Sequence, residues 1–192
     1  MRKVVLAMMT TLNGRLDAPD EWVTGLSEDH YREINTGYAT FDTILVGRVT
    51  AAEMVEYWPT AADEEGAGDS HKGMAEKMHS YKKLVFTKDP SLSVEWHNAE
   101  PVVVSTDDEI RSFVEDLKAQ PGKDIHLSGG AKLAQTLVRL GLVDEFRFFV
   151  FPTYSPGATW YGELESQMPL DLISSTAFDS GAVALYCKAA GG

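Results

Sequence analysis

The sequence predicts an α/β protein built from strand–helix–strand crossover units. The first observation is the stretch 124–152, DIHLSGGAKLAQTLVRLGLVDEFRFFVFP. Its apolar run 125–127 indicates a buried strand, leucines recur at helical spacing over 133–140, and the apolar run 146–151 indicates a second buried strand. The second observation is that the order strand, glycine, helix start recurs in 43–51, TILVGRVTA. Strand, glycine turn, helix and strand form the crossover unit of parallel sheets.

The N-terminal elements follow from apolar runs and turn-forming residues. Residues 4–9 are six apolar residues and predict the first strand, whereas 10–20, TTLNGRLDAPD, is rich in turn formers and predicts a loop. A serine followed by two acids indicates the start of a helix over 28–37. The second strand is expected at 43–46 and the helix after it at 51–58.

The remaining elements are read from the same signals. We expect an acidic surface loop at 60–70, a short helix at 72–80, strands at 84–86 and 102–104, a helix over 107–119 behind the capping box TDDE, a loop at 152–162 and a hairpin at 177–188 turning at Ser180 and Gly181. Gly141 stands where the helix of the central unit needs a left-handed end.

Length and composition limit the number of domains, the cellular compartment and the class of partner that can be expected. We expect one domain over 1–192, since 192 residues with 44% apolar and 24% charged side chains suit a single core. The single cysteine, Cys187, excludes an internal disulfide, and the apolar run 4–9 is too short for a signal peptide or a membrane span, so a cytoplasmic protein is expected. A net charge of −12 repels nucleic acid and anionic membranes, which leaves a small molecule as the expected partner.

The two glycine turns are the candidate binding features. Glycines between a strand and a helix let the backbone approach a ligand, and the helix start presents free N–H groups and a positive dipole end. Phosphate is the usual ligand of such a site. The alternative is that Gly129 and Gly130 only turn the chain tightly, because short glycine turns are common. Both interpretations remain open for the residues alone.

The motifs in their order resemble those of the dihydrofolate-reductase-like family. They read LAMMTTLNGRLD, DTILVGRVT, KKLVFTKD, IHLSGGAKLAQTLVRLGLVDEFRFFVFP and a closing GAVALYCK. The chain is most similar to the branch of the C-terminal reductase domain of the bifunctional riboflavin biosynthesis protein, and the similarity covers nearly the whole chain. It implies a three-layer fold with a mixed, mostly parallel sheet and an antiparallel C-terminal strand, and an NADPH-dependent reductase.

The resemblance also implies which residues hold the cofactor. Ala7 would meet the nicotinamide amide through its backbone. The pyrophosphate would lie between two helix starts, one formed by Gly47, Arg48, Val49 and Thr50 and the other by Gly129, Gly130, Ala131 and Lys132. Thr87 and Lys88 would contact the adenosine ribose and its phosphate, and Ser105 would lie near the adenine. For Arg48 and Lys88 the alternative is a solvated surface cation.

The substrate side departs from the family pattern. True dihydrofolate reductases place a carboxylate on the first long helix, and the corresponding position here falls on or near Tyr31, which is not an acid. Asp29, His30 and Glu33 lie close by, and a small insertion could bring one of them to this position. No catalytic residue is therefore assigned, and the proton donor could also be a bound water. We expect Asn13, Asp17, Trp22 and Tyr31 to contact substrate, with Asn13, Gly14 and Asp17 as a lid over the nicotinamide. An ordinary turn is the alternative for this loop.

Three functions fit these features. The first is hydride transfer from NADPH to a C=N or C=O bond of a small pterin-like or pyrimidine-like heterocycle. The others are a nucleotide-binding sensor or partner module without turnover, and a flavin-handling or drug-modifying reductase of the same fold. The five histidines show no metal spacing, so no metal site is expected. Relatives commonly pair, and we expect a homodimer built partly from the C-terminal strands, with the region 146–151, Trp160 and Tyr161.

Overall fold

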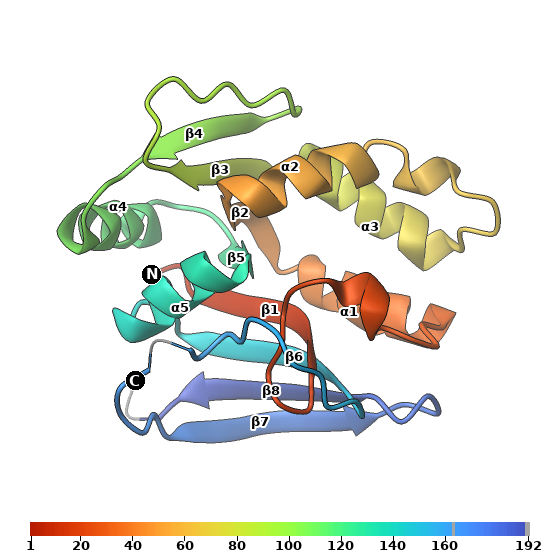
Figure 1. The fold of residues 1–192 in the computed structure, drawn as a ribbon. Helices are drawn as coiled ribbons and strands as arrows, with labels where there is room; N and C mark the ends of the chain where they lie inside the picture. Colours follow the sequence, from red (N-terminus) through yellow and green to blue (C-terminus); the bar gives the residue numbers. More distant parts are fainter. Residues whose placement is uncertain (163, 191–192) are drawn as a thin grey trace.

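The structure is a computed structural model that describes residues 1–162 and 164–190. Its strands form a single sheet in the order β4-β3-β2-β5-β1-β6-β8-β7, with β4 at one edge and β7 at the other (Figure 1). The strands are β1 (Val4–Thr11), β2 (Phe41–Gly47), β3 (Lys82–Thr87), β4 (Ala99–Val103), β5 (Asp124–Gly129), β6 (Glu145–Phe151), β7 (Leu170–Ala177) and β8 (Val183–Ala189).

The sheet is mostly parallel. Every pair from β4 to β6 is parallel, and β8 runs antiparallel to both of its neighbours, β6 and β7. The C-terminal hairpin turns where the sequence predicts, with Gly181 at φ 85° and the N–H of Phe178 donating to the carbonyl of Ala182 at 2.9 Å. Its first strand, β7, begins earlier than the predicted range 177–188, because pairing with β8 extends back to Leu170. The predicted fold class, including the antiparallel C-terminal strand, is therefore confirmed.

Helices cover both faces of the sheet and give the molecule two apolar cores. One core contains residues of α1 (Glu28–Tyr38), α2 (Arg48–Tyr57) and α3 (Asp69–Ser80), and the other contains residues of α4 (Asp107–Ala119) and α5 (Ala131–Arg139) (Figure 1). Two short 3-10 turns, Pro19–Glu21 and Ala61–Asp63, lie in the connections. In the described part of the chain no helix has the length and apolar character that crossing a membrane requires.

The helix ends show how the sequence fixes the elements. The predicted capping box is present at α4, where Glu109 N donates to Thr106 Oγ1 and Glu109 Oε2 accepts from Thr106 N. Gly141 follows α5 at φ 69°, as predicted. Two helices begin earlier than predicted: α2 at residue 48, because the extended Gly47 already serves as its N-cap, and α3 at residue 69, behind Gly68.

Candidate cofactor and substrate cleft

A cleft opens where β1 and β5 separate at their carboxyl ends. β1 pairs with β5 only from Val4 to Leu6, whereas its pairing with β6 continues to Thr11. On the other side β5 stays paired with β2 as far as Gly129. The backbone of β1 beyond Leu6 therefore has no strand partner on the β5 side. The cleft has a volume of about 880 Å³.

The helices on either side of this opening diverge. α2 follows β2 onto one face of the sheet, and α5 follows the adjacent β5 onto the other face. In α/β sheets, ligands bind in the crevice that forms at the carboxyl ends of strands where such a change of face occurs. The two helix starts thus face one cleft.

The glycine turn brings the two helix starts together. The N–H of Gly130 donates to Thr50 Oγ1 at 3.0 Å, which ties the N-cap of α5 to the first turn of α2. A Cβ at Gly130 would lie 2.6 Å from that hydroxyl oxygen, and one at Gly129 would lie 2.8 Å from the Met8 methyl group. Gly129 also has φ 87°, and the 129–130 peptide bond is cis. A side chain at Gly130 would therefore collide with the first turn of α2, and one at Gly129 would collide with Met8 of β1.

Both helix starts leave their N–H groups without a side-chain cap. The N-caps Gly47 and Gly130 offer no side chain, and neither α2 nor α5 has an acid in its first turn. α1 and α4, by contrast, carry acids there and have capping boxes. Free N–H groups and the positive end of the helix dipole favour an anion, so these two starts form a potential phosphate cradle.

Three cations line the cleft near this cradle: Arg48, Lys88 and Lys132. None of them has a carboxylate within ion-pair distance among the residues that the structure describes, although the chain holds 29 acids against 17 Lys and Arg. Most of the other basic side chains do pair; Lys118 with Asp144 is one example, at 2.8 Å. The part of the cleft beside the two helix starts is thus locally positive in a strongly acidic protein.

Most of the residues predicted to hold the cofactor meet at this cleft. Its lining includes Ala7, Gly47, Arg48, Val49, Thr50, Thr87, Lys88, Gly130, Ala131 and Lys132. Gly129 is buried in the turn behind them. Ser105 does not line the cleft, though its neighbour Val104 does, and its N–H donates to Glu109 Oε2 at 2.6 Å. The roles of these residues toward a cofactor stay predictions.

Of the four predicted substrate-binding residues, only Asp17 lines the cleft. Trp22 is 2% exposed, packs edge-on against Phe151 and donates from Nε1 to the carbonyl of Asp17 at 2.9 Å. Tyr31 stacks on His71, with ring centroids 4.7 Å apart. Trp22 therefore positions the Asp17 loop from behind, and Tyr31 lies outside the cleft lining.

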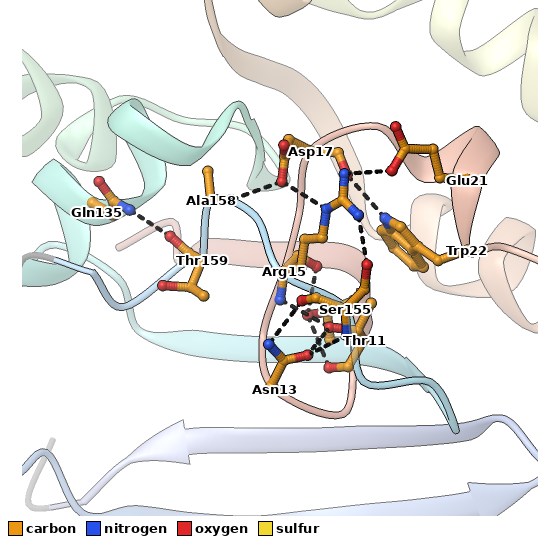
Figure 2. A network of polar contacts seen from close by, with 11 residues as sticks. Thr11, Asn13, Arg15, Asp17, Glu21, Trp22, Gln135, Ser155, Ala158 and Thr159 are labelled. Atoms are coloured by element: carbon orange, nitrogen blue, oxygen red, sulfur yellow. Dashed lines mark hydrogen bonds and ion pairs between the residues drawn. The ribbon is translucent and has the colours of Figure 1, made fainter.

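The loop that carries Asp17 is bound to the segment 153–161. Asn13 Nδ2 donates to the carbonyl of Ser155 at 2.9 Å, and Asn13 Oδ1 accepts from Ser155 N at 3.1 Å (Figure 2). The ring of Tyr161 lies against Gly14, and its hydroxyl donates to the carbonyl of Asn13. Asn13 and Gly14 are therefore engaged in holding the loop, while Asp17 reaches the cleft.

Sequence reasoning missed several residues of the cleft wall. The cleft lining includes Glu53, Met54 and Tyr57 of α2 with its C-cap Trp58, Tyr38 at the end of α1, and Met74 and Met78 of α3. A signal for the first group existed: once α2 begins at residue 48, positions 50, 53, 54 and 57 share one face at helical spacing. The contribution of α3 depends on its packing against α1, which no local pattern shows.

The protonation states of three groups in or near the cleft follow from their surroundings. Burial raises the pKa of Asp17, but hydrogen bonds from Arg15 and from the N–H of Ala158 outweigh it, so this carboxyl has a lowered pKa and is ionised at neutral pH. Burial, with a contribution from Glu64, raises the pKa of Tyr57 to about 12. Burial lowers the pKa of His126 to about 4, and its neutral ring contacts the carbonyl of Ala7 through Nε2 at 2.9 Å.

Across residues 1–162 and 164–190, no three His, Cys, Asp or Glu side chains gather as potential metal ligands.

Comparison with known proteins gives a consistent result. The model of the RibD C-terminal domain family matches residues 2–184. The uncharacterized protein YyaP of Bacillus subtilis is 30% identical over 183 residues, covering 95% of this chain and 92% of that protein.

Solved structures show the same fold at low identity. A putative riboflavin biosynthesis protein from Shewanella sp. PV-4 has a TM-score of 0.67 at 16% identity, covering 98% of this chain and 99% of that one. Dihydrofolate reductase from Enterococcus faecalis, complexed with NADP(H), has a TM-score of 0.62 at 12% identity, with 98% and 96% covered. A deaminase/5-amino-6-(5-phosphoribosylamino)uracil reductase from Thermotoga maritima has a TM-score of 0.63 at 13% identity, with 98% of this chain and 56% of that chain covered.

Proposed function

The chain belongs to the RibD C-terminal domain family, and on this premise we propose that it is an NADPH-dependent reductase. Its substrate would be a small pterin-like or pyrimidine-like heterocycle that accepts hydride at a C=N or C=O bond. Family and fold support an oxidoreductase of the RibD-like kind. We propose in addition that the cofactor is NADPH and that the substrate belongs to this class of heterocycles.

The observation that carries the proposal is that the N-termini of two helices, α2 and α5, and three unpaired cations lie together at the opening between β1 and β5. The pyrophosphate would lie beside Gly47 and Gly130, which have no side chains of their own, and the first-turn N–H groups have no side-chain cap. Thr87 and Lys88, at the end of β3, would take the adenosine ribose and its phosphate. The dinucleotide is long enough to need both helix starts, which explains why two occur.

The far side of the cradle would orient the nicotinamide. The backbone of β1 from Ala7 onward is free of β5 and offers hydrogen-bonding groups for the nicotinamide amide. The Ala7 carbonyl already accepts from His126 Nε2, and a carbonyl has a second lone pair for another donor. The bound nicotinamide supplies the hydride, while this chain supplies orientation and a partly enclosed site.

The proton that must accompany hydride transfer would come from water. Tyr31 occupies the family position for an acid and lies outside the cleft lining. Asp17 is ionised at neutral pH, so it accepts rather than donates a proton. Water can reach the open cleft, so no protonated carboxyl is required.

The test is to titrate NADPH against tryptophan fluorescence and then to follow NADPH oxidation with pterin, pyrimidine and flavin compounds. Trp58 is the one tryptophan that lines the described cleft, so binding should quench part of the emission. Arg48→Ala should weaken NADPH by about tenfold through loss of one charge-assisted contact. Lys72→Ala, which removes an exposed cation outside the cleft, is the matched control. Absence of NADPH binding by the wild-type protein would refute the proposal.

The same experiment separates the alternatives. Tight NADPH binding without oxidation by any compound would favour a sensor or partner module, and oxidation by flavins alone would favour a flavin-handling reductase. We place the protein in the cytoplasm, where its single cysteine stays reduced and NADPH is available.

We also propose a homodimer that uses the C-terminal strands. The phenylalanines of β6 are buried within the chain, and Trp160 packs on Phe146 and Phe148. The edge strand β7 instead exposes Leu172 and Ile173, which are 62% and 52% exposed. An unpaired edge with exposed apolar side chains suits pairing with a second copy.

A further inference from the structure

Charge is divided along the cleft. The cofactor end, defined by the starts of α2 and α5 and the end of β3, carries all three cations of the lining. The substrate end, defined by Asp17, Glu53, Met54, Tyr57 and Trp58, carries the two acids of the described lining and no Lys, Arg or His.

Glu53 is an unneutralised acid at the substrate end. It lies five residues beyond Arg48 on α2, which is roughly 8 Å along the helix axis. Among the described residues its carboxylate has no hydrogen-bond or ion-pair partner. It is exposed to the cleft and free to accept from a ligand.

The buried cation that contacts Asp17 does not reverse this charge. The Arg15 side chain is 7% exposed and does not line the cleft. Its guanidinium donates to Asp17 at 3.0 Å, to Glu21 at 2.8 Å and to Ser155 Oγ at 2.6 Å (Figure 2). Two carboxylates thus share one guanidinium, so the group leaves net negative charge beside the cleft.

From this division we propose that the substrate carries no phosphate and is an uncharged or cationic flat heterocycle with N–H donors. The proposal rests on the proposed function, since it takes the positive end for the cofactor. A substrate phosphate at the substrate end would meet two carboxylates and no cation, whereas amino groups could donate to Glu53 and Asp17. Tyr57, Trp58 and Met54 offer aromatic and thioether surfaces for a ring.

The expected selectivity differs from that of a structural neighbour. The Thermotoga maritima protein is described as a reductase of a phosphoribosylamino uracil. We infer that this chain instead selects against the phosphate of such a compound.

The test uses 5-amino-6-ribosylaminouracil with and without its 5-phosphate, and 2,4-diaminopteridine as a third probe. Calorimetry on the full chain saturated with NADP⁺ gives each affinity, after NADP⁺ binding has been measured separately. We expect the unphosphorylated riboside to bind about tenfold more tightly than its phosphate, because repulsion between the phosphate and the carboxylates in a partly screened cleft lowers the affinity by about that factor. Glu53→Gln should narrow this ratio and Glu53→Lys should reverse it.

The control is Glu56→Lys, which makes the same charge change one turn along α2 on a side chain that is exposed but outside the cleft lining. It should leave the ratio unchanged. The inference is wrong if the wild-type protein binds the phosphate as tightly as the riboside, or if neither unphosphorylated probe binds while NADP⁺ does. Failure to bind NADP⁺ would overturn the proposed function itself, and this inference with it.

Discussion

Lys88→Ala should lower the affinity for NADPH by about tenfold and leave the affinity for NADH almost unchanged. The two cofactors differ by one phosphate on the adenosine ribose, and Lys88 lines the cleft directly after β3, where the proposed function puts that phosphate. A charge-assisted hydrogen bond contributes roughly 1.5–3 kcal/mol, or about 10- to 100-fold in affinity.

The structure favours the low end of this range. Lys88 is exposed, so salt and water screen its charge. The Asp107 carboxylate is close enough for Lys88 to help lower the pKa of Asp107, although Arg139 has the largest effect on it. Asp89, the next residue, is bound within its own turn by the N–H and hydroxyl of Ser91, at 2.9 and 2.7 Å. Lys88 is therefore available to a phosphate but only partly desolvated.

The assay is a fluorescence titration of both cofactors at two salt concentrations. The preference of the wild-type protein for NADPH should shrink between roughly 0.1 M and 1 M salt, as the Debye length falls from about 10 to about 3 Å. Lys72→Ala, again the control, should change neither affinity. Equal wild-type affinities, or equal loss of both in Lys88→Ala, would refute this role for Lys88 and direct mutagenesis to Arg48 or Lys132.

Four further results are expected. Thr50→Val should lower the free energy of unfolding in urea by about 1 kcal/mol, because Gly130 N loses its acceptor, while Thr50→Ser should retain it. Lys83 is fully buried and donates to the carbonyls of His79 and His97, and burial lowers its pKa to about 8. Because the unfolded chain then holds this proton up to a higher pH than the folded chain, the free energy of unfolding should increase as pH rises from about 8 toward 10.5. Relative to Lys83→Met, this increase should be at most about 3 kcal/mol. Dihydrofolate should be reduced negligibly in an NADPH oxidation assay, because position 31 is a tyrosine and not an acid. Robust turnover would show that an acid at another position supplies the proton. Light scattering should give a mass near twice 21.1 kDa, reduced to one chain by Leu172→Asp with Ile173→Lys; a single-chain mass for the wild-type protein would contradict the dimer.

The order of strands and helices could be predicted because each element carries its own local signal. Apolar runs predicted β1, β5 and β6, the TDDE box predicted α4, and the glycines at 47, 130 and 141 predicted helix boundaries. These signals depend on a few neighbouring residues, which is why they survive without any knowledge of the tertiary fold.

The cofactor end of the cleft was predictable for the same reason, whereas the substrate end was not. Glycine turns and the helix starts behind them are local, so the lining at Gly47 and Gly130 followed from the sequence with the resemblance. Trp22 is apolar and sits in a loop, which suggested a ligand contact, yet it packs in the core. Met74 and Met78 reach the cleft only because α3 packs beside α1, which is a long-range arrangement.

The central place of β1 in the sheet has a consequence for how the chain reaches its native state. Val4, Val5 and Leu6 are fully buried, and their strand neighbours are β5 and β6, more than a hundred residues later in the sequence. During synthesis the first strand therefore emerges long before either neighbour exists, since β5 follows only at residues 124–129 and β6 only at residues 145–151. Such non-local pairing slows folding and exposes surfaces that promote aggregation. A nascent chain of this protein is therefore expected to be prone to aggregation until β5 and β6 have both been made, and the cleft between β1 and β5 cannot form before β5 is present.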